Sequence, residues 1–167
     1  MRIALVAHDN RKRELIEWVK YNLNELKNHE LYATGTTGKM LLDIEGDANW
    51  EEIGGGSEGA TNEKCCEYPL RQKVNCLHSG PLGGDAEIGS MIANDKLDIL
   101  IFFCDNLAVQ GHQNDIYGLT RLASLYNIAF ATNRTTADMI LTSPLFKDPN
   151  YKKILPNAIE KYKNRIV

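Results

Sequence analysis

The sequence predicts an α/β fold in which a mostly parallel, five-stranded sheet is covered by helices on both faces. Five short apolar runs alternate with segments of helical periodicity, the pattern of strand–helix–strand units joined by right-handed crossovers. The run at 99–103 reads Ile-Leu-Ile-Phe-Phe, and continuous apolar strands are typical of a parallel sheet buried on both faces. The length of 167 residues suits one domain and is too short for two. We therefore expect a single-domain, three-layer αβα sandwich of Rossmann-like architecture.

The five expected strands are short and rich in β-branched, aromatic and other apolar residues. Residues 3–7 (Ile-Ala-Leu-Val-Ala) form the first strand and 31–33 (Leu-Tyr-Ala) the second. Residues 74–77 (Val-Asn-Cys-Leu) form the third, and 99–103 and 128–131 (Ile-Ala-Phe-Ala) complete the sheet.

The expected helices show apolar residues at three- and four-residue steps, the spacing of an amphipathic helix. This spacing occurs in three segments: at Leu15, Ile16, Val19, Leu23 and Leu26; at Ile88, Met91 and Ile92; and at Ile116, Leu119, Leu122, Ala123 and Tyr126. Thr135 or Thr136 is expected to cap a further helix that runs through Leu141. Leu155-Pro156 precedes a final amphipathic helix that contains Ile159, Tyr162 and Ile166.

Residues 45–73 interrupt this regular alternation. The unit from 31 to 74 spans 43 residues, whereas the other units span about 25 to 30 each. The excess is polar, rich in glycine and without clear periodicity, so we expect a surface insertion within one domain covering 1–167. It contains the adjacent Cys65 and Cys66. Three interpretations of the insertion stay open: a tolerated surface loop, an interaction surface or a redox element.

Composition excludes several classes of protein. Lys and Arg total 19 against 22 Asp and Glu, a net charge of -3, which argues against a domain-wide surface for nucleic acid. No apolar run approaches the roughly 20 residues that a membrane span needs. Residues 1–7 form a first strand rather than a signal peptide, and the four cysteines form no C-x-x-C pair. We therefore expect a cytoplasmic protein with free thiols and no nucleic-acid or membrane partner.

Polar and small residues gather directly after the expected strands. Ligands bind at the carboxyl ends of the strands in an open α/β sheet, so these residues are candidates for one site. In strand order they are His8, Asp9 and Lys12; Thr34, Gly35, Thr36 and Thr37; Ser79, Gly80 and Asp85; Asp105, His112 and Asp115; and Thr132 with Asn133.

Two of these turns predict a phosphate site. The turn at 34–38 (Thr-Gly-Thr-Thr-Gly) offers three hydroxyls, and its glycines let backbone N–H groups approach a ligand at a helix N-terminus. Ser79-Gly80 adds a hydroxyl and another amide, and Lys12 supplies positive charge. Helix capping would explain either turn alone. Two turns and a lysine at one sheet edge favour a bound phosphate.

The remaining residues suit proton transfer. A carboxylate beside a neutral imidazole can enolise a carbonyl compound, because the carboxylate removes a carbon-bound proton while the imidazole polarises the oxygen. The candidates are Asp85, Asp105 and Asp115 with His8 and His112. No motif with metal-ligand spacing occurs, so we expect no metal. The residues alone leave open an enzyme or a sensor for a small phosphorylated carbonyl compound.

Several ordered motifs resemble the methylglyoxal synthase family. They are IALVAHD at 3–9, YATGTTG at 32–38, SGPLGGD at 79–85, DILIFFCD at 98–105, ATN at 131–133, TAD at 136–138 and the LP at 155–156. The similarity covers nearly the whole chain apart from 45–73. It implies a lyase of a cytoplasmic glycolytic bypass, which converts dihydroxyacetone phosphate to methylglyoxal and inorganic phosphate without metal or cofactor.

The resemblance also implies a role for each site residue. Asp85 is the expected base, and His112 polarises the substrate carbonyl with His8 nearby. Asp9, Asp105 and Asp115 order the acid–base network. The expected phosphate ligands are Lys12, Thr34, Gly35, Thr36, Thr37, Ser79 and Gly80. The family is typically a homohexamer that phosphate inhibits, and an arginine matching Arg165 reaches a neighbouring subunit's site.

The chain departs from the family pattern in its insertion, in a proline-free stretch at 106–111, and in Gln113-Asn114 after His112. The main alternative is a non-catalytic regulatory module of the same fold that binds a phosphorylated ligand, as in carbamoyl phosphate synthetase. The cyclohydrolase of purine biosynthesis is a more distant alternative. A module needs the phosphate turns but not the full set of Asp85, Asp105 and His112, which favours the enzyme.

Overall fold

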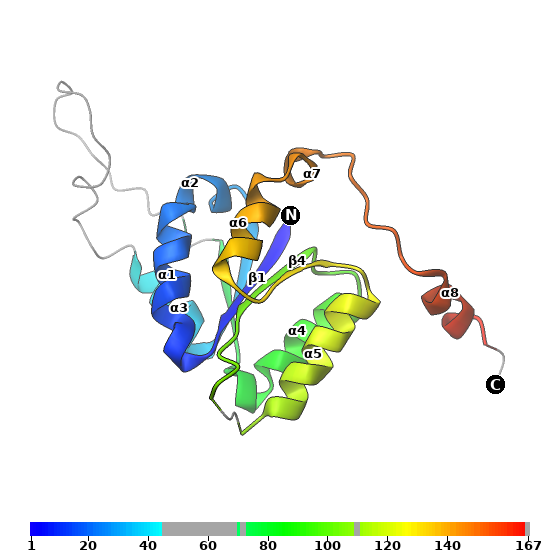
Figure 1. The fold of residues 1–167 in the computed structure, drawn as a ribbon, viewed down its shortest axis with the longest axis horizontal. Helices are drawn as coiled ribbons and strands as arrows, with labels where there is room; N and C mark the ends of the chain where they lie inside the picture. The colour runs from blue at the N-terminus through cyan, green and yellow to red at the C-terminus, as the bar shows by residue number, and fades with distance from the viewer. Residues whose placement is uncertain (45–69, 71–72, 109–110, 166–167) are drawn as a thin grey trace.

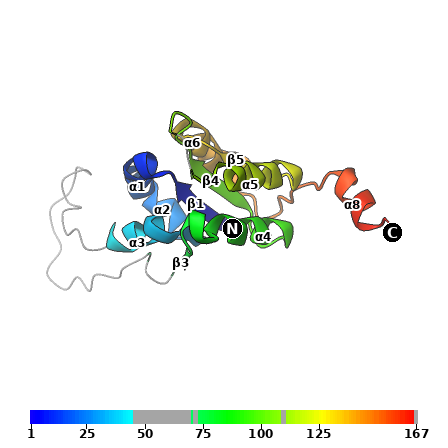
Figure 2. The same ribbon diagram turned by 90° about the horizontal axis from the view of Figure 1, so that it is seen from below.

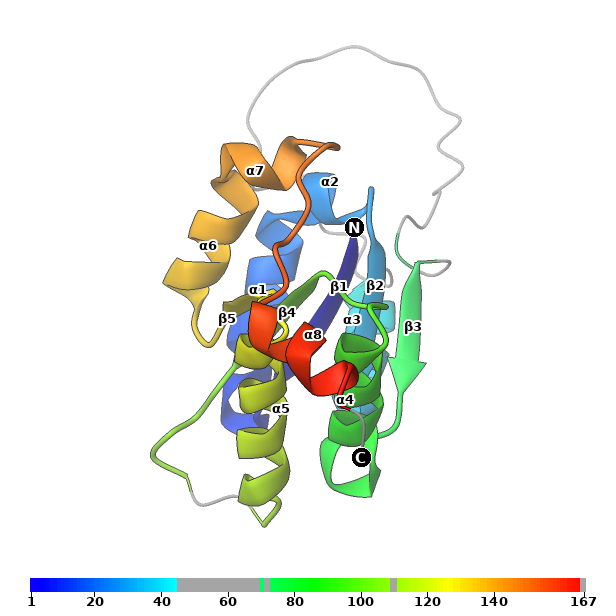
Figure 3. The ribbon, with the colours of Figure 1, turned by 90° about the vertical axis from the view of Figure 1, so that its right-hand side faces the viewer.

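The computed structural model describes residues 1–44, 70, 73–108 and 111–165. Its sheet has five strands, all parallel, in the order β3-β2-β1-β4-β5 (Figure 1). The strands are β1 (Arg2–Ala7), β2 (Glu30–Thr34), β3 (Val74–Leu77), β4 (Ile99–Phe103) and β5 (Ala129–Ala131). The chain winds outward from β1 to β3, which forms one edge (Figure 3), and then returns to β4 on the other side of β1. This arrangement confirms the expected fold class and places the change of direction between β1 and β4, where such sheets bind ligands.

Helices cover both faces of the sheet, with α4 and α5 on one side and α1, α3 and α6 on the other (Figure 1). Successive residues of β1 point to opposite faces, so Ile3 and Leu5 join one core cluster while Ala4 and Val6 join the other. The elements on the first face are α1 (Lys12–Tyr21), α2 (Leu23–Leu26), α3 (Gly35–Asp43), α6 (Arg134–Thr142) and α7 (Pro144–Lys147). Those on the second are α4 (Gly84–Ala93) and α5 (Gln113–Leu125). None of the helices in the described ranges is long and apolar enough to cross a membrane.

Two helix boundaries differ from the sequence-based expectation. The periodic pattern from Leu15 to Leu26 is divided into α1 and α2 at Asn22, whose backbone N–H bonds to carbonyls of the last turn of α1. The cap of α6 is Asn133, and the expectation of Thr135 or Thr136 was wrong. The Asn133 side chain accepts a 3.0 Å hydrogen bond from the Thr136 N–H, because an asparagine at the N-cap satisfies an amide that the helix leaves free.

The C-terminal segment crosses the outside of the second helix layer and ends in α8 (Asn157–Lys163), which stands apart in Figures 1 and 2. The Asn127 side chain donates to the Ile154 carbonyl at 2.9 Å, and Lys153 pairs with Asp95 at 2.6 Å. Ile159 of α8 is buried, as an amphipathic helix requires, while Ile166 lies outside the described residues.

Most of the expected insertion at 45–73, including Cys65 and Cys66, lies outside the described residues. Two of its members are described. Lys73 is exposed, but Leu70 is fully buried in the core cluster of the first face, and its carbonyl accepts from the N–H groups of Lys73 and Val74. Leu70 is thus a core residue at the entry to β3.

Gly118 offers a test of the α5 assignment. Beyond its chain neighbours and the backbone of its own helix, a methyl group added there meets no atom of the described residues within 4 Å, and glycine inside a helix is less stable than alanine by about 0.5–1 kcal/mol. Gly118→Ala is therefore expected to raise the free energy of unfolding by about that amount in urea denaturation. Gly89→Ala in α4 is the contrast, because its methyl would lie 3.1 Å from Leu122 Cδ1. A destabilised Gly118→Ala would contradict the helix.

Candidate active site

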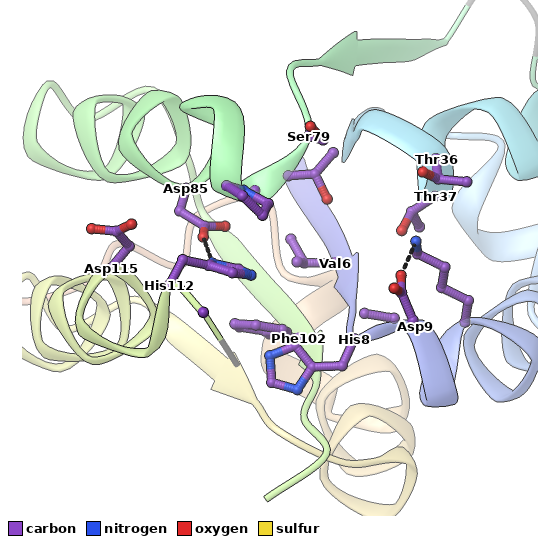
Figure 4. Close-up of a pocket in the computed structure, with 16 residues that line it drawn as sticks. Val6, His8, Asp9, Thr36, Thr37, Ser79, Asp85, Phe102, His112 and Asp115 are labelled. Atoms are coloured by element: carbon purple, nitrogen blue, oxygen red, sulfur yellow. Dashed lines mark hydrogen bonds and ion pairs between the residues drawn. The ribbon is translucent and has the colours of Figure 1, made fainter. Parts of the chain in front are cut away.

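A pocket of about 700 Å³ opens at the carboxyl ends of β1 to β4 (Figure 4). It brings together most of the residues that the sequence analysis selected. Those that line it are His8, Asp9, Lys12, Thr34, Thr36, Thr37, Ser79, Gly80, Asp85, His112 and Asp115. Figure 4 shows Asp85, His112 and Asp115 on one side, and Thr36, Thr37 and Asp9 on the other.

Five expected site residues lie outside this lining: Gly35, Asp105, Thr132, Asn133 and Arg165. The Asn133 side chain instead caps α6. The Gly35 N–H donates to the His78 carbonyl at 3.1 Å, so this amide is already bonded and is not a free donor for phosphate. Asp105 does not line the pocket, but its backbone N–H donates to His8 Nδ1. Arg165 lies at the far C-terminal end, with its guanidinium 4.7 Å from the ring centre of Tyr162. The contact of Arg165 with a neighbouring subunit stays a prediction.

Asp85 and His112 form the central pair of the site. Asp85 belongs to the first turn of α4 and His112 is the N-cap residue of α5, and the His112 Nδ1 lies 2.9 Å from Asp85 Oδ2. Both side chains are largely withdrawn from solvent, with 3% of Asp85 and 17% of His112 exposed. A methyl on Gly80 would lie 3.1 Å from both Asp85 carboxylate oxygens and from His112 Cε1. Glycine at 80 thus lets the backbone close over the pair.

His8 follows β1 and is held in one tautomer. Its Nδ1 accepts a 2.8 Å hydrogen bond from the Asp105 N–H, so in the neutral ring the proton is on Nε2. The ring packs edge-on against Phe102, with centroids 5.0 Å apart. Burial lowers the pKa of His8 below its ordinary value and favours this neutral form. Nε2 is buried and has no partner among the described residues, so it is a donor available to a ligand in the pocket.

The opposite wall has the properties of an anion site. Thr34 is the N-cap of α3 and Ser79 is the N-cap of the short turn η4 (Gly80–Leu82), yet neither side chain makes a capping hydrogen bond. Capping therefore does not explain these two hydroxyls. Thr37 Oγ1 is buried and finds no partner in the part of the chain that the structure describes, and the N-terminus of α3 adds partial positive charge. Phosphate oxygens would satisfy these donors.

Lys12 brings a full positive charge to this wall. Its Nζ lies 2.5 Å from Asp9 Oδ1, and only 17% of its side chain is exposed, against 91% for Asp9. The hydrogen bond and charge of Lys12 lower the pKa of Asp9. Asp9 therefore holds the ammonium group at the pocket.

Two contacts of the site could not be predicted from the sequence, although Asn10 follows the first strand together with His8 and Asp9. Phe102 lies within the uniformly apolar run of β4, where no pattern distinguishes a ring that supports a histidine from one that fills the core. Asn10 donates to Asp105 Oδ2 at 2.9 Å, and this bond lowers the pKa of the Asp105 carboxyl. The second oxygen, Oδ1, accepts from the Leu107 and Ala108 N–H groups.

Among the described residues, no cluster of three or more His, Cys, Asp or Glu side chains could hold a metal ion.

The pKa of His8 can be measured directly. In phosphate-free buffer, its ring protons are expected to titrate below 6.5 in an NMR experiment between about pH 5 and 8, with His8→Gln used to assign the signal. Because the folded pKa is lowered, the unfolded chain takes up the proton first as pH falls. His8 therefore reduces stability progressively as pH drops below its unfolded value. Titration of His8 at or above 6.5 would contradict the buried, neutral ring.

Comparison with known proteins agrees with this geometry. A family model described as an MGS-like domain matches residues 60–132. Methylglyoxal synthase of Coxiella burnetii is 44% identical over 166 residues, covering 99% of this chain and 97% of that protein. The enzyme of Leptospira interrogans is 45% identical over 154 residues, covering 92% and 86%. The crystal structure of methylglyoxal synthase from Elizabethkingia anophelis superposes with a TM-score of 0.77 at 36% identity, covering 99% and 91%. At this identity and coverage, the chain belongs to the methylglyoxal synthase family.

Proposed function

We propose that this chain is a phosphate-eliminating carbon–oxygen lyase that converts dihydroxyacetone phosphate to methylglyoxal and inorganic phosphate. The observation that carries the proposal is the 2.9 Å contact of Asp85 with His112 opposite the donors of the anion site. A regulatory module would need only the anion wall. The names of the similar proteins support the same activity.

In the first step, Asp85 removes a proton from the hydroxymethyl carbon of the substrate. The C–H electron pair moves into the adjacent carbonyl and gives an enediolate. The Nε2–H of His8 is a neutral donor that can stabilise the developing oxyanion. His112 orients Asp85 through Nδ1, and when doubly protonated it also donates to the substrate through Nε2.

In the second step, the enediolate expels phosphate. The terminal hydroxyl loses its proton and becomes the aldehyde carbonyl, while the other enediolate oxygen takes up a proton. The double bond shifts toward the phosphate-bearing carbon, the C–O bond to the phosphate breaks, and its electron pair leaves with the phosphate. The enol of methylglyoxal that remains then ketonises, as its methylene carbon takes up a proton and its hydroxyl releases one. Elimination is fastest when that C–O bond stands out of the enediolate plane, where it overlaps the π system. Hydroxyls of Thr34, Thr37 and Ser79 would hold the phosphate in that orientation, and Lys12 would stabilise the departing charge.

The other carboxylates have supporting roles in this scheme. Asp105 keeps His8 in its tautomer through its backbone N–H and holds the following loop through its side chain. Asp9 positions Lys12. Asp115 lies one turn into α5 beside His112 and adds negative charge to this side of the pocket.

We further propose the finer properties that the family resemblance implies. The chain acts in the cytoplasm, in a glycolytic bypass, as one domain that covers 1–167 with an insertion at 45–73. It assembles as a homohexamer in which Arg165 reaches a neighbouring site, and its product phosphate inhibits it. The exposed position of Arg165 beyond α8 is consistent with such a contact. Protein groups supply the base and the electrophile, so the reaction requires no metal or cofactor.

A discontinuous assay tests the activity. Purified protein with dihydroxyacetone phosphate is expected to release inorganic phosphate and, in equal amount, a dicarbonyl product trapped as an adduct. The rate is expected to be the same with and without EDTA. Binding of the substrate without phosphate release would favour the regulatory module.

A further inference from the structure

His78 joins the two turns that form the anion wall. It follows β3 directly, precedes Ser79, and lies outside the pocket lining. Its carbonyl accepts from the Gly35 N–H at the start of α3, at 3.1 Å. Its own N–H donates to Glu87 Oε2 in the first turns of α4, at 2.9 Å. The backbone of one residue is thus bonded to both α3 and α4, two helices that begin at the pocket.

Glu87 holds His78 with both carboxylate oxygens. Oε1 lies 2.7 Å from the His78 Nδ1, in addition to the backbone bond to Oε2. These two bonds lower the pKa of Glu87, so the carboxylate stays ionised and accepts both donors. The two side chains remain partly exposed, at 37% for Glu87 and 71% for His78. The contact between Glu87 and His78, called the Glu87–His78 clasp below, therefore consists of directed hydrogen bonds and not of core packing.

The Glu87–His78 clasp joins the two ends of the segment 78–87, which carries proposed catalytic and phosphate-binding groups. Between His78 and Glu87 lie Ser79, Gly80 and Asp85. The segment is already compact, since the Gly84 N–H bonds to the Ser79 carbonyl at 3.0 Å. A methyl on Gly84 would meet the His78 carbonyl oxygen at 2.1 Å. With so little free space, a shift of His78 would move the anion wall and Asp85 relative to each other.

We propose that Glu87 is a positioning residue for the reaction: by holding His78 it sets the spacing between Ser79, Asp85 and the start of α3. This inference rests on the proposed function of the pocket. Glu87 does not line the pocket, so it acts through His78 and not on the substrate.

The test compares Glu87→Ala, Glu87→Gln and a matched control in the full chain. Glu25→Gln is the control, because Glu25 also faces a histidine (His29 Nε2 at 3.7 Å) and is 33% exposed, but lies in α2, which leads into the amino end of β2, and does not line the pocket. The readouts are kcat and KM with dihydroxyacetone phosphate, the Kd of inorganic phosphate by calorimetry, and the thermal midpoint.

Glu87→Ala is expected to lower kcat/KM by about 10- to 100-fold and to weaken phosphate binding severalfold, because small displacements of catalytic groups are costly. Glu87→Gln keeps one oxygen for the His78 N–H and is expected to fall between Glu87→Ala and the wild type. Glu25→Gln is expected to match the wild type in both kinetics and phosphate affinity.

Each other outcome has a definite meaning. If Glu87→Ala loses thermal stability but keeps kcat/KM and phosphate affinity within about twofold of the wild type, Glu87 is merely structural and the inference is overturned. In that case wild-type turnover would still support the proposed function. If the wild type binds phosphate but has no turnover, the function fails, and the phosphate affinity of the variants alone decides the inference. A wild type that binds no phosphate contradicts both.

Discussion

Asp85→Asn is expected to lower kcat by at least about 100-fold, the usual contribution of a general base. The amide has nearly the same size as the carboxylate but cannot take a proton from carbon. It can still contact His112, so the pocket should keep its shape. Asp85 is 4% exposed, and removing its negative charge from an anion pocket should leave phosphate affinity equal or tighter.

Steady-state kinetics and calorimetric titration with inorganic phosphate would measure the two effects separately. Asp43→Asn is the matched control, because Asp43 is exposed at the far end of α3 and the same substitution there should change neither quantity. A kcat within about tenfold of the wild type would rule out Asp85 as the base. Loss of phosphate binding together with kcat would show that the substitution had disturbed the whole pocket.

His112→Ala is expected to lower kcat by about 100- to 1,000-fold, the range found when a donor to a developing oxyanion is removed. The substitution removes Nε2, which would face the substrate, and also leaves the buried Asp85 carboxylate without its partner. Two separate losses are therefore combined in this variant.

His112→Asn separates the two losses. An asparagine amide nitrogen occupies about the position of imidazole Nδ1, so this variant can keep the bond to Asp85 while losing Nε2. We expect kcat to stay as low as in His112→Ala, with KM nearer the wild type. Recovery of kcat by His112→Asn to within about tenfold of the wild type would mean that His112 only orients Asp85. In that case His8 would be the main electrophile.

The elements of the fold could be predicted because local patterns determine them. The apolar run of β4 and the amphipathic spacing of α5 are properties of single segments, and each was found within a few residues of its observed bounds. Boundaries that depend on one hydrogen bond were not predictable. Asn133 displaces the two threonines as the cap of α6 because its side chain reaches the Thr136 N–H. The apolar pattern does not contain that geometry.

The sequence indicated which residues lie at the pocket better than it indicated the hydrogen bonds that they make. Parallel strands bring their carboxyl ends to one edge, so residues following four strands had to meet there. The sequence did not indicate which of their hydrogen-bond donors would stay available to a ligand. Gly35 belongs to the phosphate turn by sequence, yet its N–H is bonded to His78. Glu87 carries no motif of its own, and its clasp on His78 depends on how α4 packs beside β3.

The sequence by itself determined the parallel α/β architecture and indicated two turns suited to an anion and a set of carboxylates and imidazoles, because hydrophobic periodicity and residue type act locally. Only the tertiary structure decided which of those groups contact one another. It brings the Asp105 N–H to His8 and leaves Nε2 of that ring as a donor, and it places His112 against Asp85. Hydrogen bonds between residues 97 and 27 positions apart make these assignments, and they exist only once the strands and helices have packed.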